Sequence, residues 1–199
     1  WRVGELGRRA LLLEKNRKPG VKILISGGTR CNITHDCDER GIIAAFGSAG
    51  KFLHSPLAAL GPREVVKLFE AEGARTYVEE GTGKVFPVSE RALDVARALV
   101  ARLDRSGATL ALDEPVVELA RAGEGFRLVT SKRTLTCDKL LITTGGKSYP
   151  GCGTTGDGYA WLAALGHTIR PPRPALVPLT SDEVWVRELT GIALPDVLV

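Results

Sequence analysis

Ala10-Leu11-Leu12-Leu13-Glu14 is a short apolar strand that ends in an acid, and Ile23-Leu24-Ile25-Ser26-Gly27-Gly28-Thr29-Arg30-Cys31-Asn32 follows it closely. In dinucleotide-binding folds such an acid binds the adenosine ribose, because two hydroxyl groups can donate to one carboxylate. The glycine pair exposes backbone N–H groups beside a cation and a side-chain amide, which suits a phosphate or the edge of a flavin. Taken alone, the pattern is also typical of an ordinary strand with a glycine-rich turn.

The composition is that of a globular protein with one core and part of a second domain. The chain has 199 residues, of which 44% are hydrophobic and 25% are charged. It begins with Trp1, contains no methionine and ends in the apolar run Asp196-Val197-Leu198-Val199, which resembles a strand. We therefore expect a fragment of a longer protein.

Charge and cysteine usage narrow the function classes. The net charge is +4, but the basic residues are scattered and aromatic residues make up only 6% of the chain. We expect no nucleic-acid partner, and we assign the surplus charge to solvated surface and an anionic cofactor. Four cysteines without a C-x-x-C pair and three separated histidines predict no metal site. A reduced, cytoplasmic protein without a membrane-spanning segment is expected.

Hydrophobic periodicity and turn residues predict an α/β fold. The last of the predicted strands, Lys139–Thr143, is apolar on both faces, as in a buried parallel sheet. A stiff connector at 171–174 and an apolar segment at 176–179 follow the last predicted helix. The predicted helices are the tail of one in 1–9, then 62–72, 90–105 (capped by Ser89) and 157–165; the predicted strands are 10–14, 76–78, 84–87, 109–112, 116–120, 126–130, 134–137 and 139–143; residues 15–46 are expected to be loosely structured.

Two further glycine-containing segments are candidate binding sites. Thr144-Gly145-Gly146 follows the predicted buried strand, where bare backbone can touch a ring or a pyrophosphate. Thr154-Thr155-Gly156-Asp157-Gly158-Tyr159 opens a helix whose free N–H groups suit an anionic or carbonyl group. The structural alternative for the first segment is a tight turn after a core strand. The alternative for the second is a helix start capped by Thr155 or Asp157.

Together, these motifs resemble the BaiN-like family of NAD(P)/FAD-dependent oxidoreductases, and the resemblance covers essentially the whole chain. It implies a glutathione-reductase-like FAD-binding domain, with a parallel sheet, helices and a small β-meander, at residues 1–170. Residues 171–199 would then begin an inserted substrate domain. The stretches that carry the resemblance are Ile23–Thr34, Thr144–Pro150, Gly153–Tyr159, Leu165–Ile169 and Pro174–Leu179.

The resemblance implies a FAD-dependent oxidoreductase that transfers electrons between a small organic substrate and NAD(P)H or oxygen. Some family members are described as aminoacetone oxidases, and others as reductases of unsaturated steroid-like substrates. Two alternatives remain open: a non-catalytic module that binds nucleotides or nucleic acid, and an inactive truncated remnant.

Site residues carried over from the family begin with Glu14 as the ribose-binding acid. Thr29 stands where many relatives have a third glycine, so its side chain narrows the approach there. Val116 resembles a residue whose backbone meets adenine. The remaining implied cofactor-binding residues are Lys15 beside the acid; Lys22, Ser26, Gly27, Gly28, Arg30, Cys31 and Asn32 along the flavin nucleotide; Thr144, Gly145 and Gly146 near the pyrophosphate and flavin; and Gly156 and Asp157.

One departure from the family pattern concerns the phosphate loop. The ribose acid of dinucleotide folds lies roughly 20 residues beyond the G-x-G-x-x-G loop, and only 13 residues precede Glu14. We therefore expect this polypeptide alone to bind FAD weakly or not at all, and to be inactive in isolation.

The motifs themselves demand no catalytic acid, base or nucleophile, because the chemistry of a flavoenzyme belongs to its ring. Cys31 and Cys152 are either redox groups or packing groups, and packing is favoured. His35 and Tyr149 are either proton donors near a ring or surface and structural residues. Arg30 is expected either to face the pyrophosphate or to support the glycine loop.

Overall fold

The computed structural model describes residues 1–174 and 180–192. The chain divides into two compact units, residues 1–168 and 169–199, and each is considered separately. The expectations for 176–179 and for Asp196–Val199 lie outside the described residues. The assignment of the two sequence regions to a FAD-binding domain and an inserted domain stays a prediction.

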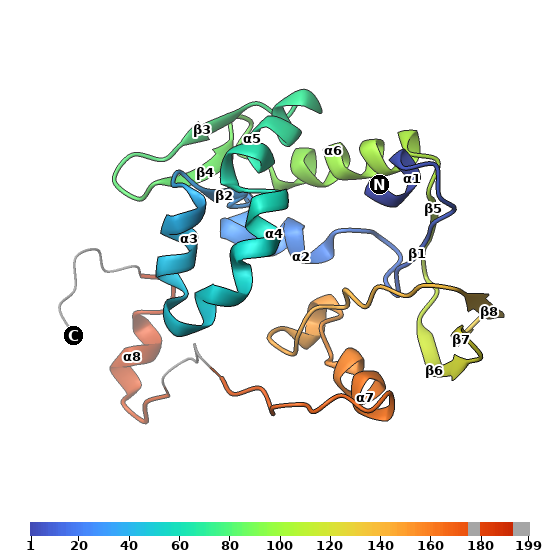
Figure 1. The fold of residues 1–199 in the computed structure, drawn as a ribbon. Coiled ribbons are helices and arrows are strands. Elements are labelled where there is room, and N and C mark those ends of the chain that lie inside the picture. Colours follow the sequence, from blue (N-terminus) through green and yellow to red (C-terminus); the bar gives the residue numbers. More distant parts are fainter. Residues whose placement is uncertain (175–179, 193–199) are drawn as a thin grey trace. The chain divides into compact units, whose positions relative to one another are not determined.

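The first unit alternates short helices and strands (Figure 1). Its strands are β1 (Leu11–Leu13), β2 (Thr34–His35), β3 (Thr76–Val78), β4 (Lys84–Pro87), β5 (Thr109–Ala111), β6 (Val116–Ala122), β7 (Gly125–Thr130) and β8 (Thr134–Cys137). Its helices are α1 (Arg2–Glu5), α2 (Val21–Ile25), α3 (Glu39–Ala45), α4 (His54–Ala59), α5 (Pro62–Ala71), α6 (Ala92–Arg105) and α7 (Asp157–Ala164), and its 3₁₀ helices are η1 (Ser26–Thr29), η2 (Gly47–Leu53) and η3 (Pro150–Cys152).

The parallel pair β1–β5 holds the predicted acid-tipped strand. Leu12 lies opposite Leu110, and the backbone N–H of Glu14 donates to the carbonyl of Ala111 at 2.9 Å. Parallel strands need a long crossover connection, and here it includes α5 and α6. The predicted strands at 10–14 and 109–112 are confirmed.

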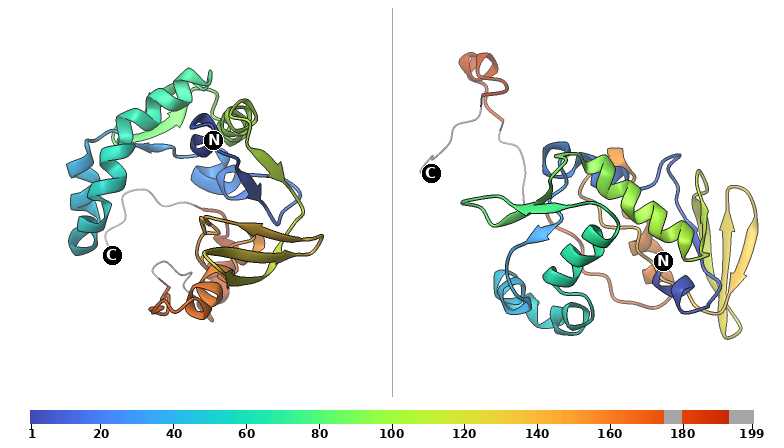
Figure 2. Two further views of the ribbon diagram at one scale, coloured as in Figure 1. Left: turned by 45° about the vertical axis from the view of Figure 1, so that its right-hand side comes forward. Right: turned by 90° about the horizontal axis from the view of Figure 1, so that it is seen from above.

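Two antiparallel sheets complete the strand pairing. One has the order β2-β4-β3, and its β3–β4 hairpin is the one predicted from the sequence. The other is the predicted meander, in the order β6-β7-β8, with a register shift between Val116 and Glu118. Figure 2 shows this meander beside α7, and residues of α7 contact β6.

The main core forms where α5 and α6 pack against the glycine-containing segment. Pro62 begins α5 at its first turn, and Gly107, with a φ of +73°, follows the end of α6, as predicted. Cys31 is buried in the same cluster as Phe69 and Val95, and Ile23 and Ile33 pack against it. Burial of apolar surface therefore fixes residues 23–33 against the two longest helices of the unit.

Three local predictions are wrong. Residues 139–143 form no strand, because the segment makes no ladder with any described strand, and Leu141 is 78% exposed. The stretch 15–46 is not loosely structured but contains α2, η1, β2 and α3, since its apolar residues pack on the core. Arg91, not Ser89, is the N-cap of α6, and no side chain caps that helix.

The second unit contains α8 (Val184–Glu188). Within residues 1–174 and 180–192, the helices are all too short or too polar to cross a bilayer.

Candidate functional site

In the first unit, residues of the second and third glycine-containing segments contact each other and two lysines that precede the first segment in the chain. The ammonium of Lys15 donates to the Thr155 hydroxyl at 2.6 Å, and that of Lys22 donates to the Ser148 hydroxyl at 3.3 Å. A Cβ at Gly158 would lie 2.7 Å from the Thr144 hydroxyl. Segments more than a hundred residues apart in the sequence thus share one region of the structure.

Glu14 lies directly after β1, and one of its two carboxylate oxygens accepts a hydrogen bond within the protein. One carboxylate oxygen accepts from the backbone N–H of Asn16 at 2.8 Å, and no described residue donates to the other oxygen. The carbonyl of Glu14 accepts from the N–H of Glu114 at 3.0 Å, which brings the chain leading to Val116 beside the strand tip. Glu14 therefore retains one acceptor oxygen for a hydroxyl donor.

Lys15 connects the strand tip to the start of α7. Its ammonium lies 2.8 Å from the Asp157 carboxylate, which also accepts from the Thr155 hydroxyl. The hydrogen bond from Lys15 has the larger effect and the one from Thr155 the smaller, and both hold the pKa of Asp157 below its usual range. Gly156, with a φ of +85°, is the N-cap of α7, so neither Thr155 nor Asp157 caps this helix as the structural alternative required.

The glycine segment forms a turn with a left-handed backbone, which we call the glycine turn (residues 27–31). Gly27 and Gly28 have φ values of +56° and +64°, and Thr29 and Cys31 have φ values of +72° and +67°. A Cβ at Gly27 would lie 2.8 Å from the backbone nitrogen of Asn32, whereas one at Gly28 would meet nothing within 4 Å. Gly28 therefore presents its bare backbone to open space.

Residues 144–146 offer unpartnered backbone donors. No described residue accepts a hydrogen bond from the N–H of Thr144, Gly145 or Gly146. Gly145 has a φ of +76°, and a Cβ there would lie 3.1 Å from the methyl group of Thr154. This segment can therefore bind an anionic or carbonyl oxygen through its main chain.

Arg30 contacts the β3–β4 hairpin and the segment that leads into α6. Its guanidinium lies 2.9 Å from the Glu79 carboxylate, 3.4 Å from the Glu90 carboxylate and 3.9 Å above the ring of Phe86. The geometry favours the expectation that Arg30 supports the loop. Sequence reasoning missed Glu79, Glu90 and Phe86, because no periodicity or motif links them to the turn.

The other singled-out side chains have structural surroundings. Cys31 and Cys152 are buried, burial raises the pKa of the Cys31 thiol, and the Cys152 thiol donates to the Tyr149 carbonyl at 3.0 Å. The His35 ring lies 3.0 Å from the Thr82 carbonyl on the β3–β4 hairpin. These contacts fit packing and structural roles.

Two cavities lie beside helices α6 and α7. One of about 360 Å³ lies between α6 and residues 18–24 and is lined mainly by apolar side chains such as Leu24, Leu93 and Val100. Another of about 250 Å³ lies between α7 and Phe126, Leu140 and Ile142.

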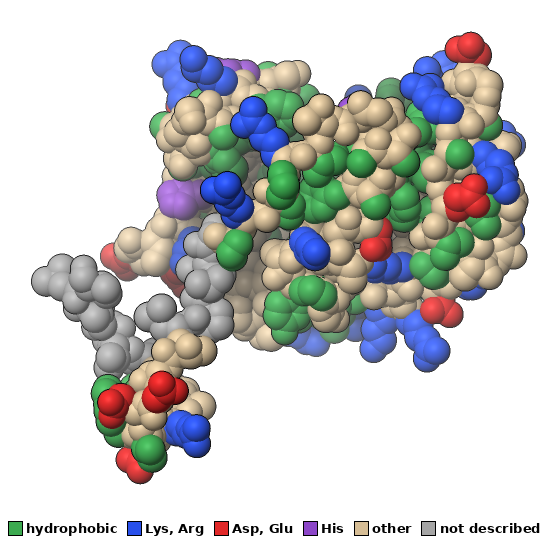
Figure 3. Space-filling view, turned by 90° about the horizontal axis from the view of Figure 1, so that it is seen from below, with side chains coloured by type: hydrophobic (Ala, Val, Ile, Leu, Met, Phe, Trp, Pro, Cys, Tyr) green, Lys and Arg blue, Asp and Glu red, His purple; other side chains and the backbone are tan. Residues whose placement is uncertain are grey.

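Among the described residues, no group of His, Cys, Asp or Glu has an arrangement that could hold a metal ion. Figure 3 shows Lys and Arg side chains scattered over one face of the molecule.

The sequence profile of the HI0933-like protein Rossmann domain matches residues 1–195. The chain belongs to this family. The parallel pair β1–β5, the helices and the meander are accordingly parts of a Rossmann-like α/β fold.

Two relatives of this chain are named for their activities. A "Ribosomal RNA dihydrouridine synthase" of Escherichia coli (strain K12) is 34% identical, with 98% of this chain and 49% of the relative covered. A "3-dehydro-bile acid delta(4,6)-reductase" of Clostridium scindens is 28% identical, with 92% of this chain and 44% of the relative covered. The chain thus spans about half the length of the curated relatives it matches.

A solved structure, Thermovibrio ammonificans THI4, superposes with a TM-score of 0.39 at 11% identity, over 65% of this chain and 42% of that one. At this TM-score the likeness establishes nothing about function.

Proposed function

We propose that this chain is the FAD-binding part of an oxidoreductase. The observation that carries the proposal is a pair of contacts: Lys15, which follows the strand-tip acid, meets Thr155, and Lys22, which precedes the glycine turn, meets Ser148. In nucleotide-binding Rossmann folds an acid at a strand tip binds the ribose and glycine-rich backbone approaches the phosphates. Membership of a Rossmann-domain family supports the same function.

Glu14, Gly28 and residues 144–146 each support a specific contact to this cofactor. Glu14 would accept hydrogen bonds from the ribose hydroxyls through its free carboxylate oxygen. Gly28 leaves room for the cofactor to approach the main chain closely, because nothing fills the space that a side chain would occupy there. The N–H groups of Thr144, Gly145 and Gly146 would donate to pyrophosphate or ring oxygens. Bound flavin would supply hydride-transfer chemistry, and these residues would bind and orient it.

The names of the two relatives point to one class of reaction. Dihydrouridine differs from uridine by reduction of a ring carbon–carbon double bond conjugated to a carbonyl, and a delta(4,6)-reductase of a 3-dehydro-bile acid likewise reduces double bonds conjugated to a ketone. We therefore propose reduction of a conjugated carbon–carbon double bond. One hydride and one proton add to the two carbons, and NAD(P)H is oxidised to NAD(P)⁺.

The test uses the full-length protein that carries this chain. After purification and incubation with FAD, we expect a stoichiometric flavin absorbance spectrum. With NADH or NADPH, we expect substrate-dependent oxidation of the nucleotide when unmodified ribosomal RNA or a conjugated steroid ketone is added. Mass spectrometry of RNA nucleosides or of the steroid would detect the gain of two hydrogens. A protein that shows no flavin absorbance after the excess FAD has been removed would contradict the proposal.

A nucleic-acid-binding function is the second candidate, because a relative named for ribosomal RNA matches nearly the whole chain. If RNA is only bound and not reduced, RNA affinity should fall steeply with salt while the protein shows no affinity for FAD. Filter binding at several salt concentrations, run beside the flavin titration, separates the two functions.

A further inference from the structure

The glycine turn has a backbone that its own residues do not favour. Of the five residues in 27–31, Arg30 alone has a negative φ, at −88°. Thr29 and Cys31 are not glycines, and Thr29 is β-branched, so their left-handed conformations are strained. Contacts elsewhere in the structure must therefore hold this shape.

Two sets of contacts hold the turn. Cys31 is buried in the core between α5 and α6, which fixes the end of the turn. Arg30 fixes its middle, with the guanidinium stacked on Phe86 and paired with Glu79 and Glu90. Phe86 is almost fully buried, so the surface on which Arg30 stacks is rigid.

The two carboxylates are themselves held in place. Glu79 accepts from the Thr82 hydroxyl at 2.7 Å, and Glu90 accepts from the Tyr77 hydroxyl. Hydrogen bonds from Thr82 and Arg30 lower the pKa of Glu79, which keeps it ionised at neutral pH. Arg30 thus lies against two oriented carboxylates rather than against a mobile surface.

The electrostatics disfavour a direct phosphate contact by Arg30. One guanidinium between two carboxylates forms a cluster with a net negative charge, and a pyrophosphate placed there would be repelled. The distances also show that the Nη1 donor is already engaged by both acids. Arg30 is therefore better suited to shaping the turn than to binding an anion.

We propose that Arg30, held by Glu79 and Glu90, is a positioning residue that maintains the glycine turn in its binding conformation. This inference rests on the proposed flavin site: Arg30 sets flavin affinity through the backbone of the turn and does not itself touch the cofactor.

The test compares FAD affinity in the full-length protein and in four variants, measured by fluorescence titration. Arg30→Gln should weaken FAD binding by roughly tenfold, which corresponds to the strain held in about one left-handed residue. The double variant Glu79→Gln/Glu90→Gln should weaken FAD binding in the same direction. Adding Arg30→Gln to that double variant should have little further effect, because the three side chains act as one unit. Arg127→Gln, which removes the partner of Glu118 on the meander, is the matched control and should leave FAD affinity unchanged.

A direct phosphate contact gives the opposite pattern. Removing Glu79 and Glu90 would then tighten FAD binding, since two repelling charges disappear, and Arg30→Gln would weaken binding in every background. Either result overturns the proposal.

Hydrogen exchange of the flavin-free protein tests the positioning role independently of the proposed function. Amides of residues 27–32 should exchange several-fold faster in Arg30→Gln than in the wild type, while those of β6–β8 stay unchanged. Unchanged exchange in the turn contradicts the proposal even if the wild type binds no flavin. Should Arg30→Gln fail to fold, Glu90→Gln alone is measured in the same two ways, with the same expected directions.

Discussion

At the scale of single residues, the proposed flavin site depends on the backbone of the glycine turn. The sequence predicts that glycines expose main-chain donors here, and the structure adds which of them faces open space. Gly27 is closed off by Asn32 and Phe86, whereas Gly28 is open. The two adjacent glycines therefore differ in their surroundings: Gly27 is packed, whereas Gly28 is open to a ligand in the proposed site.

Substitution of Gly28 separates stability from flavin binding. Gly28→Ala places a Cβ on a residue with a φ of +64° but creates no clash within the protein, so the free energy of unfolding should fall by only about 1 kcal/mol. Flavin binding should nevertheless be lost, because the new methyl group occupies the approach path. Urea denaturation and a flavin titration measure the two effects.

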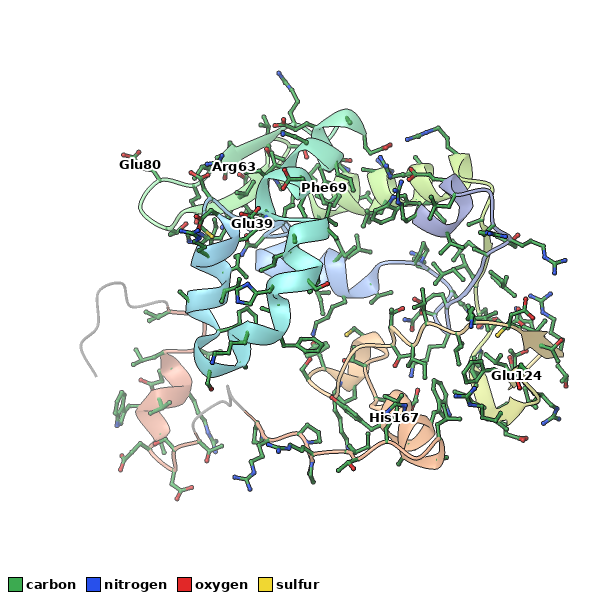
Figure 4. The ribbon with its side chains drawn as sticks, viewed as in Figure 1. Glu39, Arg63, Phe69, Glu80, Glu124 and His167 are labelled. Atoms are coloured by element: carbon green, nitrogen blue, oxygen red, sulfur yellow. The ribbon has the colours of Figure 1, made fainter. Side chains whose placement is uncertain are left out.

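Gly123→Ala is the matched control for this variant. Gly123 has a φ of +57°, and an added Cβ there would also meet nothing within 4 Å. It lies in the turn between β6 and β7, where Figure 4 labels its neighbour Glu124. A similar stability loss with unchanged flavin affinity is expected. Equal flavin loss in both alanine variants would refute the assignment of Gly28.

At the scale of elements, α5 and α6 pack against the segment that carries the glycine turn. The segment that carries the glycine turn reaches the core through Cys31, Ile23 and Ile33, so the packing of these helices fixes the position of the turn. Phe69 on α5 belongs to this cluster, and its side chain is only 8% exposed.

Two phenylalanine-to-alanine substitutions test this packing. Phe69→Ala should lower the free energy of unfolding by about 3–5 kcal/mol, because it removes a buried ring and leaves a cavity. Phe52→Ala makes the same chemical change at a side chain that is 85% exposed, and its effect should stay within about 0.5 kcal/mol. Denaturant titrations of both variants in one protein background give the comparison. Equal destabilisation would mean that Phe52 is covered in the folded protein.

At the scale of the whole molecule, the parallel sheet is small for a nucleotide-binding domain. Within the described residues, β1 pairs only with β5, and Leu11 and Leu12 remain exposed. Two-stranded sheets are marginally stable without further packing. The site therefore rests on a sheet whose β1 edge is unsupported by any described strand.

Comparison of this polypeptide with the full-length protein tests the consequence. Residues 1–199 alone should retain substoichiometric flavin after purification, while the full-length protein should retain about one equivalent, because a weakly supported sheet does not hold Glu14 and the glycine turn in register. Absorbance spectra of both preparations after equal dialysis are the measurement. Full occupancy of residues 1–199 would disprove this expectation.

The sequence by itself determined most of the local elements and the α/β class of the fold. Apolar spacing and end signals such as Pro62 and Gly107 predicted α5 and α6, and alternation with turn residues predicted the meander, because these patterns act through the backbone of neighbouring residues. Only the tertiary structure decided that Lys15 meets Asp157, that Arg30 lies between Glu79 and Glu90, and that 139–143 forms no strand. Such contacts join residues far apart in the chain, and a strand needs a partner beside it, so no local pattern encodes them.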